Sequence, residues 1–241
     1  MNRPIRSLKL LAALLSYPSQ ELIAAAPEIA RRLGEERVLR HATQNALAGL
    51  LAQLAREDLL DLQERYVAQF DTGRSTSLHL FEHVHGDSRD RGQAMIDLHA
   101  LYDRGGVKLA GNELPDFLPA VLEFLSTRPY GEAREMLEDC AHIVRAVGER
   151  LLASGSPYVA VFGAILDLLG QAPLSAQAHP SEERSLDEEW SETPVEFGPN
   201  AAPHTVQTSR PQFIRFVPRR EALPKHVENA ARQSGAPHGS Q

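Results

Sequence analysis

"MLEDCAHIVRAVGERL", residues 136–151, places apolar side chains at helical intervals and polar side chains between them. The apolar positions are Met136, Leu137, Cys140, Val144, Val147 and Leu151. Side chains three or four residues apart share one face of an α-helix, because the helix repeats about every 3.6 residues. The pattern therefore predicts an amphipathic helix that packs one face against a core.

The same spacing continues on both sides of this segment. Residues 159–169 form one further apolar stripe before Gly170. Toward the N-terminus, helices are expected at residues 5–15, 19–34, 39–54, 59–70, 88–102 and 118–125. No stretch alternates polar and apolar residues with a period of two, and no hairpin turn signal occurs, so the sequence predicts no sheet. We expect an all-α fold, a single-domain helical bundle of about eight helices over residues 1–170.

The composition changes after Gly170. The last 71 residues contain nine of the sixteen prolines and no sustained apolar period. Residues 182–196 hold seven Asp or Glu, whereas residues 210–232 hold six Lys or Arg. Because such a segment buries too little apolar surface to offset its ordering entropy, we expect residues 171–241 to be a Pro-rich, charge-segregated and largely disordered tail. Two stretches keep aromatic side chains and either dock on the body or a partner or stay unstructured: "DEEWSETPVEF" (187–197) and "PQFIRFVP" (211–218).

Net charge and cysteine content exclude several classes of protein. The formal charge is −7 and the isoelectric point about 5.8, whereas a general nucleic-acid binder carries a net basic footprint. The single cysteine, Cys140, rules out an intramolecular disulfide and fits a reducing compartment. We therefore expect a cytoplasmic protein that does not bind nucleic acid.

The N-terminal segment is basic and then apolar, with Arg3, Arg6 and Lys9 around the start of the apolar run 10–15. This run is shorter than the apolar region of a signal peptide, and no small-residue cleavage site follows it. No segment approaches the roughly 18 apolar residues that a membrane span needs. We interpret the segment as the first amphipathic helix of a protein without stable membrane insertion. A membrane-surface adaptor that uses its basic helix is a competing hypothesis.

"HLFEH", residues 79–83, matches the H-x-x-E-H zinc signature of the inverzincin peptidases. In an α-helix, His79 and His83 would share a face and Glu82 could polarise a metal-bound water. However, the match is short, no substrate-binding sheet is predicted, and His85 would lie about 200° around the helix from His83. A zinc-dependent hydrolase that uses the HLFEH motif is therefore the alternative hypothesis, and we expect no metal.

The residues around this motif have two interpretations. One takes Leu78, Phe81 and Val84 as core anchors in a connection between helices, with the polar residues as solvated decoration. That interpretation does not account for the dense donors and acceptors of "HGDSRDRGQ" (85–93). Two arginines of this stretch fall in the first turn of the next helix, where they oppose the helix dipole. A local electrostatic cost of this kind favours a binding function.

No catalytic constellation accompanies these residues. The chain has no nucleophile elbow, phosphate-binding loop, dinucleotide fingerprint or cysteine cluster. We therefore expect a protein that is not an enzyme and that holds no cofactor.

Residues 65–126 read "RYVAQFDTGRSTSLHLFEHVHGDSRDRGQAMIDLHALYDRGGVKLAGNELPDFLPAVLEFLS". This stretch resembles the nitrate reductase delta subunits, the family of molybdenum cofactor assembly chaperones, and "LDEEWSETPVEF" (186–197) resembles their tail. "ELPDFLPAVL" (113–122) is similar to the signature E-x-P-D-H-L-x-x-E-L of the wider TorD-like chaperone family. The matching positions are Glu113, Pro115, Asp116, Leu118 and Leu122. Phe117 replaces the usual His and Val121 the usual Glu.

The resemblance implies an all-helical chaperone that is not part of the finished enzyme. Its partner would be the apo catalytic (alpha) subunit of a respiratory nitrate reductase, whose N-terminal segment it would bind in the cytoplasm. It would hold that subunit ready for molybdenum cofactor insertion, assist assembly of the complex and delay docking to the membrane subunit. Molybdenum cofactor delivery proteins are further candidate partners.

A groove that binds an amphipathic helix needs apolar walls and charged residues that fix the direction of the helix. Residues 66–93 offer both, so we expect the peptide groove there, with Tyr66, Phe70 and Phe81 as walls. Asp116, in the TorD-like signature, marks the next candidate region. The predicted peptide-binding residues are Tyr66, Phe70, Phe81, Glu82, His83, His85, Asp87, Arg89, Asp90, Arg91, Gln93 and Asp116.

Overall fold

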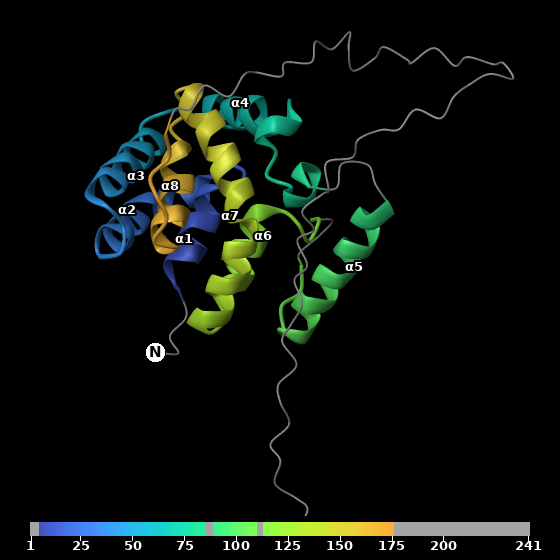
Figure 1. Cartoon of the computed structure of the whole chain (residues 1–241). Helices are drawn as coiled ribbons and strands as arrows, with labels where there is room; N and C mark the ends of the chain where they lie inside the picture. Colours follow the sequence, from blue (N-terminus) through green and yellow to red (C-terminus); the bar gives the residue numbers. More distant parts are fainter. Residues whose placement is uncertain (1–4, 85–88, 110–112, 176–241) are drawn as a thin grey trace, which may run out of the picture.

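The computed structural model describes residues 5–84, 89–109 and 113–175 (Figure 1). The α-helices are α1 (Ser7–Leu14), α2 (Gln20–Gly34), α3 (His41–Leu54), α4 (Leu59–Phe70), α5 (Arg89–Arg104), α6 (Leu118–Leu125), α7 (Tyr130–Ala153) and α8 (Val159–Leu168). Two short 3-10 helices, η1 (Arg74–Thr76) and η2 (Leu80–His83), follow α4. Within the described ranges there is no strand, and one isolated antiparallel bridge joins His79 and Phe117. The all-α prediction is confirmed, and each of the eight expected helices is present.

The core lies between α1, α6, α7 and α8. Helix α1 packs against α6 and α8, and α7 packs against α8 and α6. Helices α2 and α3 cover one side of this group, where α3 packs on α8 (Figure 1). All six apolar residues of the segment 136–151 are buried, and Leu137, Cys140, Val144 and Leu151 are completely inaccessible. The helical stripe read from the sequence is therefore the face of α7 that packs into the core.

Local signals in the sequence set several helix ends. The Ser19 hydroxyl accepts a hydrogen bond from the Leu22 amide at 3.3 Å and so caps the N-terminus of α2. Gly155 and Gly170 follow α7 and α8 with φ of +69° each. A left-handed residue after a helix favours glycine, because other residues place Cβ too close to the backbone.

Helices α7 and α8 approach each other closely at Gly148. A Cβ atom at this position would lie 3.0 Å from the Cβ of Phe162 and 2.9 Å from Cδ1 of Leu174. Because the Phe162 contact involves an atom next to the backbone, Gly148→Ala should force the helices apart. We expect the substitution to lower the free energy of unfolding by about 1–3 kcal/mol, measured by urea unfolding.

Gly49→Ala in α3 provides the matched control. No heavy atom lies within 4 Å of a Cβ added at Gly49. Because alanine favours the helix over glycine by up to ~1 kcal/mol, this control should be as stable as the parent or more stable. Equal stability of the two alanine variants would contradict a tight α7–α8 contact.

Helix α5 stands at the edge of the bundle (Figure 1). The second half of α5 packs on the body through the buried side chains of Leu98, Leu101 and Tyr102. Ile96, nearer the start of the helix, is 63% exposed. The Tyr102 hydroxyl also donates to the Pro115 carbonyl at 2.7 Å. This bond ties α5 to the segment that leads into α6.

The chain continues along α7 after the predicted domain boundary at Gly170. The Arg145 guanidinium donates to the carbonyls of Ala172 at 2.9 Å and Pro173 at 3.3 Å. Leu174 packs against the core beside Gly148. The contacts with the body therefore extend a few residues beyond Gly170. The rest of the expected tail, residues 176–241, lies outside the described residues.

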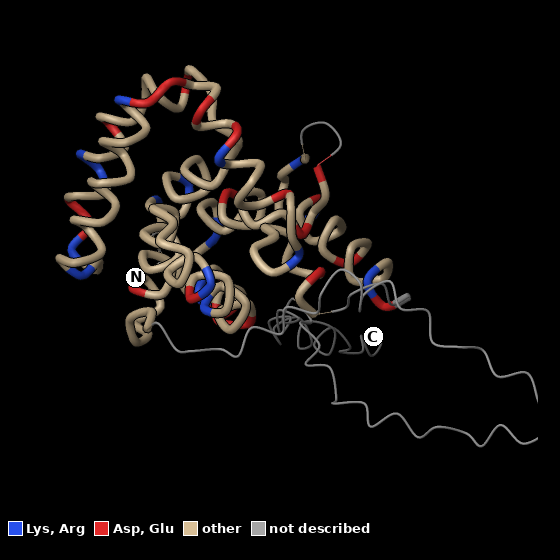
Figure 2. Tube along the Cα trace, turned by 90° about the horizontal axis from the view of Figure 1, so that it is seen from above, with Lys and Arg blue, Asp and Glu red and all other residues tan. Residues whose placement is uncertain are grey.

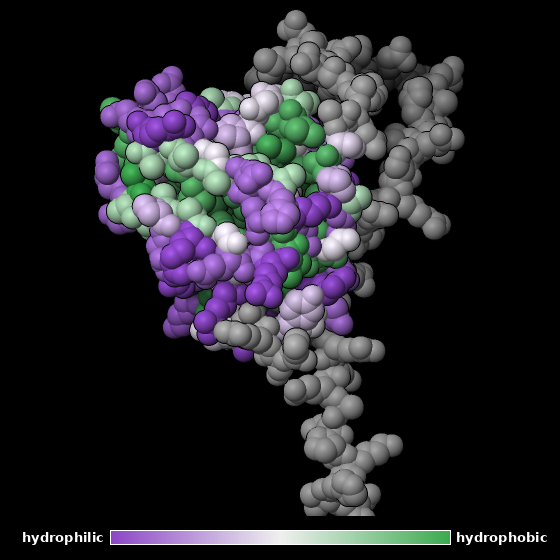
Figure 3. All heavy atoms as spheres, turned by 90° about the vertical axis from the view of Figure 1, so that its left-hand side faces the viewer, coloured by the Kyte–Doolittle hydropathy of each residue, from purple (hydrophilic) through white to green (hydrophobic). Residues whose placement is uncertain are grey.

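The surface mixes charges of both signs. Lys and Arg alternate with Asp and Glu along the outer helices (Figure 2), and on α2 Arg31 pairs with Glu28 at 2.8 Å and Glu35 at 2.7 Å. On the side formed by α2 and α3, apolar surface lies between polar areas (Figure 3). Among the described helices, none has both the length and the hydropathy that crossing a bilayer requires.

Candidate functional site

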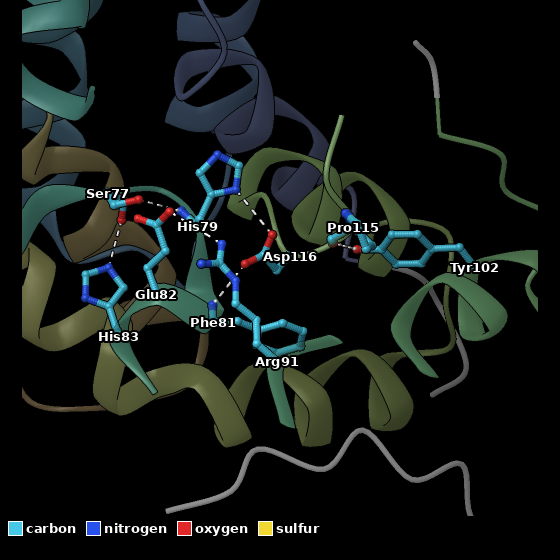
Figure 4. A network of polar contacts seen from close by, with 9 residues as sticks. All are labelled: Ser77, His79, Phe81, Glu82, His83, Arg91, Tyr102, Pro115 and Asp116. Carbon is cyan, nitrogen blue, oxygen red and sulfur yellow. Dashed lines mark hydrogen bonds and ion pairs between the residues drawn. The ribbon is translucent and has the colours of Figure 1, made fainter. Parts of the chain in front are cut away.

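A buried carboxylate, Asp116, holds the HLFEH segment in place (Figure 4). Its side chain is inaccessible to solvent, and both carboxylate oxygens accept hydrogen bonds. Oδ1 accepts from Nδ1 of His79 at 3.2 Å, and Oδ2 accepts from the backbone amide of Phe81 at 3.1 Å. We call Asp116, His79 and Phe81 the Asp116 clamp. A buried carboxylate is stable in such a position only when hydrogen-bond donors surround it.

Backbone contacts reinforce the clamp. The Leu80 amide donates to the Asp116 carbonyl at 3.0 Å, and the Leu118 amide donates to the Leu78 carbonyl at 2.8 Å. These bonds flank the bridge between His79 and Phe117. The segment before η2 is thereby fixed to the N-terminus of α6, although more than thirty residues separate the two in sequence.

The two histidines of the motif have different environments. The hydrogen bond to the Asp116 carboxylate raises the pKa of His79, against the opposing effect of partial burial. Nε2 of His83 donates to the Ser77 carbonyl at 2.9 Å. Burial lowers the pKa of His83, and the bond to Ser77 offsets only part of this effect.

The zinc hypothesis required His79 and His83 on one face of an α-helix, and this premise is wrong. His79 is the extended residue before η2, and His83 ends that short 3-10 helix. Each imidazole is engaged by a separate partner, Asp116 or Ser77. Among the described residues, no group of three His, Cys, Asp or Glu side chains has the arrangement of a metal site. His85 lies outside the described residues.

The three aromatic side chains expected as groove walls lie in the core. Tyr66 and Phe70 are each 4% exposed and Phe81 is 1% exposed. The rings of Tyr66 and Phe70 lie 4.9 Å apart between centroids, and the Phe70 ring meets Tyr158 at 5.0 Å. The expectation that Phe70 and Phe81 form walls is therefore corrected, because their rings complete the core. Phe81 is the core anchor of the other interpretation, whereas Tyr66 also borders an open groove.

The polar residues of the predicted site occupy a separate part of the surface. Glu82 and Arg91 are both half-buried and approach to 3.5 Å, which joins η2 to the start of α5 (Figure 4). Asp90 and Gln93 are exposed on α5, and Gln93 donates to Asp97 at 2.9 Å. His85 and Asp87 lie outside the described residues, as does the side chain of Arg89.

An open groove lies on the solvent side of the clamp, between α1 and α6 and beneath the segment that follows α5. We call it the α1–α6 groove; its volume is about 1150 Å³. It is lined by Lys9, Ala12, Ala13, Ser16, Tyr17, Tyr66, Asp71, His79, Val107, Lys108, Leu109, Glu113, Leu114, Phe117, Pro119, Ala120, Glu123 and Thr127. The clamp therefore forms part of the groove wall through His79, while Asp116 and Phe81 support it from behind.

The α1–α6 groove combines apolar walls with an excess of carboxylates. Tyr17 is 51% exposed and Leu114 is 44% exposed, so both present apolar surface to the groove. The Phe117 ring lies 5.3 Å from the His79 ring, so these two side chains form one continuous edge. Three carboxylates line the groove against two lysines, and one lysine, Lys9, already pairs with Glu123 at 3.0 Å. The groove therefore suits an apolar segment that carries positive charge.

Sequence reasoning missed the exposed apolar residues of this groove. Tyr17 follows α1, and Leu114 and Phe117 lie within the segment 113–122 that resembles the TorD-like signature. One sequence signal for an apolar groove wall was available: Phe117 replaces the His that the wider family has at this position. Apolar patterning could not identify Tyr17 and Leu114, because it does not distinguish an exposed side chain from a core one.

Comparison with known proteins identifies the family. The model of the family described as nitrate reductase delta subunit matches residues 36–164. The nitrate reductase molybdenum cofactor assembly chaperone NarJ of Escherichia coli (strain K12) is 39% identical over 198 residues, which cover 79% of this chain and 84% of NarJ. The protein named as the assembly chaperone NarW of the same organism is 41% identical over 232 residues, 93% of this chain and 97% of NarW.

A solved structure has the same fold. The chain of a protein described as a redox enzyme maturation protein from Archaeoglobus fulgidus superimposes with a TM-score of 0.52 and 21% sequence identity. The match covers 71% of this chain and 97% of that one. The sequence matches and the all-helical fold agree: the chain belongs to the nitrate reductase delta subunit family, a family of assembly chaperones and not of enzymes.

Proposed function

We propose that this chaperone binds the N-terminal segment of the apo catalytic (alpha) subunit of a respiratory nitrate reductase, and that the α1–α6 groove is the binding site. The observation that carries the proposal is the groove itself, whose walls expose Tyr17 and Leu114 and include three carboxylates against two lysines. An amphipathic helix buries its apolar face in such a groove and uses its charges to set its direction.

The charges of the groove specify the chemistry of the bound segment. Asp71, Glu113 and Glu123 line it, with Glu123 paired to Lys9. Because like charges across an interface are repulsive and opposite charges attract, a segment with Lys or Arg beside its apolar face fits better than an acidic one. The predicted residues Glu82, Asp90, Arg91 and Gln93 lie on η2 and α5, outside the lining of this groove, and their contact with the peptide stays a prediction.

Binding the N-terminal segment explains how a chaperone of this kind assists assembly. A segment held in the groove is not available for other contacts, so docking of the catalytic subunit to its membrane partner is delayed. The rest of the catalytic subunit stays accessible for molybdenum cofactor insertion in the cytoplasm, with cofactor delivery proteins as further partners. The chaperone then leaves the finished enzyme.

A synthetic peptide that copies the N-terminus of the cognate catalytic subunit tests the proposal. It should bind the full chain saturably and gain helical circular dichroism on binding. Tyr17→Ala should weaken binding by about 1–2 kcal/mol, because an aromatic side chain at the centre of an interface is a typical hot spot. The affinity is measured by isothermal titration calorimetry.

The control for this experiment is Leu60→Ala. Leu60 lies in α4, is 73% exposed and does not line the α1–α6 groove, so the peptide affinity of this variant should equal that of the parent. Leu60→Ala should melt at the parent temperature, whereas Tyr17→Ala also loses the contact with the Tyr66 ring at 5.5 Å, so affinities are compared at a temperature where both variants are folded. Equal peptide affinity for Tyr17→Ala and the parent would show that the groove is not the binding site.

A further inference from the structure

A second groove lies at the other end of α1 and has the opposite charge. It has a volume of about 860 Å³ and is bounded by α1, the end of α2, the end of α8 and the turn between α6 and α7. Ile5, Leu10, Val38, Tyr130 and Leu168 provide its apolar surface. Val38 is 57% exposed and Tyr130 is 39% exposed. We call it the α1–α2 groove.

Cations outnumber carboxylates on the walls of this groove. Arg6, Lys9, Arg31 and Arg32 line it, against Glu35 and Glu36. Arg31 and Arg32 pair with Glu28, Arg31 also pairs with Glu35, and Lys9 pairs with Glu123, so within the described residues Arg6 is the cation of this groove without an ion-pair partner. The α1–α6 groove, which shares Lys9 and Thr127 with this one, has more carboxylates than lysines, so the two grooves favour segments of opposite charge.

The wall also contains a buried hydroxyl without a partner. Ser7, the first residue of α1, is 4% exposed, and its Oγ makes no hydrogen bond within the described chain. A buried hydroxyl that lacks a partner is unfavourable. Because Ser7 Oγ can donate and the N-terminus of a helix favours negative charge, a carboxylate is the ligand that suits this position.

We propose that residues 187–197 of this same chain, "DEEWSETPVEF", dock in the α1–α2 groove. The segment carries five carboxylates and no Lys or Arg, and its apolar side chains are Trp190, Val195 and Phe197. Its aromatic residues can pack on the exposed Val38 and Tyr130. Its carboxylates can pair with Arg6 and accept a hydrogen bond from the Ser7 hydroxyl. The carboxylate-lined α1–α6 groove repels the same segment.

The length of the chain permits this contact. The described chain ends at residue 175, just after Leu174 has packed beside Gly148 of α7. Tyr130, at the groove, lies eighteen residues earlier in the same helix, a rise of about 27 Å. Twelve residues join positions 175 and 187, and in extended form they span up to ~40 Å. The linker is therefore long enough for the segment to reach the groove.

The single tryptophan of the protein makes the contact measurable. Trp190 is the only Trp in the chain, so fluorescence excited at the red edge of the absorption band, where the five tyrosines do not absorb, reports on this segment alone. In the parent protein we expect blue-shifted emission and protection from acrylamide quenching. The protection should be lost at high salt, because screening weakens the ionic contacts.

Two substitutions reverse a charge and replace an apolar side chain in the groove without changing a core residue. Arg6 and Val38 are exposed, and Arg6→Glu places a favourable charge at the N-terminus of α1. The double variant Arg6→Glu, Val38→Asp should shift Trp190 emission to the red and raise its quenching to that of free tryptophan. Arg56→Glu, on the surface after α3, and Lys108→Glu, in the α1–α6 groove, should leave the fluorescence unchanged.

A second variant lies in the tail and cannot unfold the body. Glu188→Lys with Glu192→Lys should expose Trp190 to the same extent as the groove variant. In all variants, binding of the catalytic-subunit peptide to the α1–α6 groove is measured separately, so loss of one site is not confused with loss of the other.

Three results would overturn the proposal. The first is solvent-exposed Trp190 in the parent protein. The second is shielded Trp190 that neither pair of substitutions releases. The third is shielding that disappears on dilution, which would mean that the segment docks on a second copy of the chain. Shielding that is independent of protein concentration and is released by both pairs of substitutions establishes the contact within one chain.

Discussion

Phe81→Ala should lower the free energy of unfolding by about 3–5 kcal/mol, the cost of emptying a buried phenylalanine site. Phe81 is 1% exposed, and its backbone amide donates to the buried carboxylate of Asp116 at 3.1 Å. The substitution keeps the hydrogen bond from the backbone amide of residue 81 to Asp116. The loss of stability therefore comes from the cavity that the missing ring leaves. Urea unfolding followed by circular dichroism measures the effect.

Peptide affinity distinguishes this role from direct binding. Under conditions where the variant is still folded, it should bind the catalytic-subunit peptide almost as well as the parent, because the Phe81 ring does not line the α1–α6 groove. Ile96→Ala is the control for an apolar truncation at the surface, since Ile96 is 63% exposed, and its stability should change by less than about 0.5 kcal/mol. Unchanged stability of Phe81→Ala with lost affinity would place the ring in the binding site instead.

Asp116→Ala should cost about 2–4 kcal/mol of stability. The substitution leaves the Phe81 amide buried without an acceptor and removes the partner of His79. A buried donor that loses its partner costs about 1–3 kcal/mol, and loss of a bond to a charged group adds to this. Asp116→Asn is the matched control, because its amide oxygen still accepts from Phe81, and it should cost less than Asp116→Ala.

The pH dependence of the Asp116→Asn variant provides an independent test. Because Asp116 raises the pKa of His79 in the folded protein, this contribution is fully present below the unfolded pKa of 6.5 and is lost as the pH rises through the folded pKa. The stability difference between the parent and Asp116→Asn should therefore narrow as the pH rises from below 6.5 through the raised pKa of His79. His83 has a lowered pKa and acts in the opposite direction in both proteins, and the Asp116 charge slightly counteracts this lowering in the parent, so His83 changes the difference in the same direction as His79. A difference that widens with rising pH would contradict the role of His79 in the clamp.

The helices could be predicted because their apolar side chains recur at helical spacing, although α6 and α8 bury most of their residues rather than one stripe. The stripe of α7 at Leu137, Cys140 and Val144 is completely buried, and the spacing alone indicated it. The two 3-10 helices were not predicted, because the bonds that hold η2 come from Asp116, a residue more than thirty positions later. Non-local bonds of this kind leave no periodic signal in the sequence.

The sequence indicated the region that adjoins the α1–α6 groove but not the exposed residues that line it. An apolar residue in an irregular segment serves equally well as a core anchor or as a groove wall, and for Phe81 the three-dimensional packing places the ring in the core. Conversely, Tyr17 and Leu114 are exposed in the groove although nothing in their local sequence distinguishes them from buried residues. The resemblance to the TorD-like signature indicated Asp116, but only the structure shows that this carboxylate supports the groove from behind.

The complete burial of Cys140 in α7 protects its thiol from oxidation. Its thiol faces the carbonyls of Leu137 at 3.4 Å and Met136 at 3.6 Å, and burial raises its pKa to about 12. Since the thiolate is the reactive form, the sulfur is both unreachable and unreactive at neutral pH. Cys140 is the only cysteine of the chain, so the folded protein cannot form disulfide-linked dimers, and it can be stored and assayed without a reducing agent.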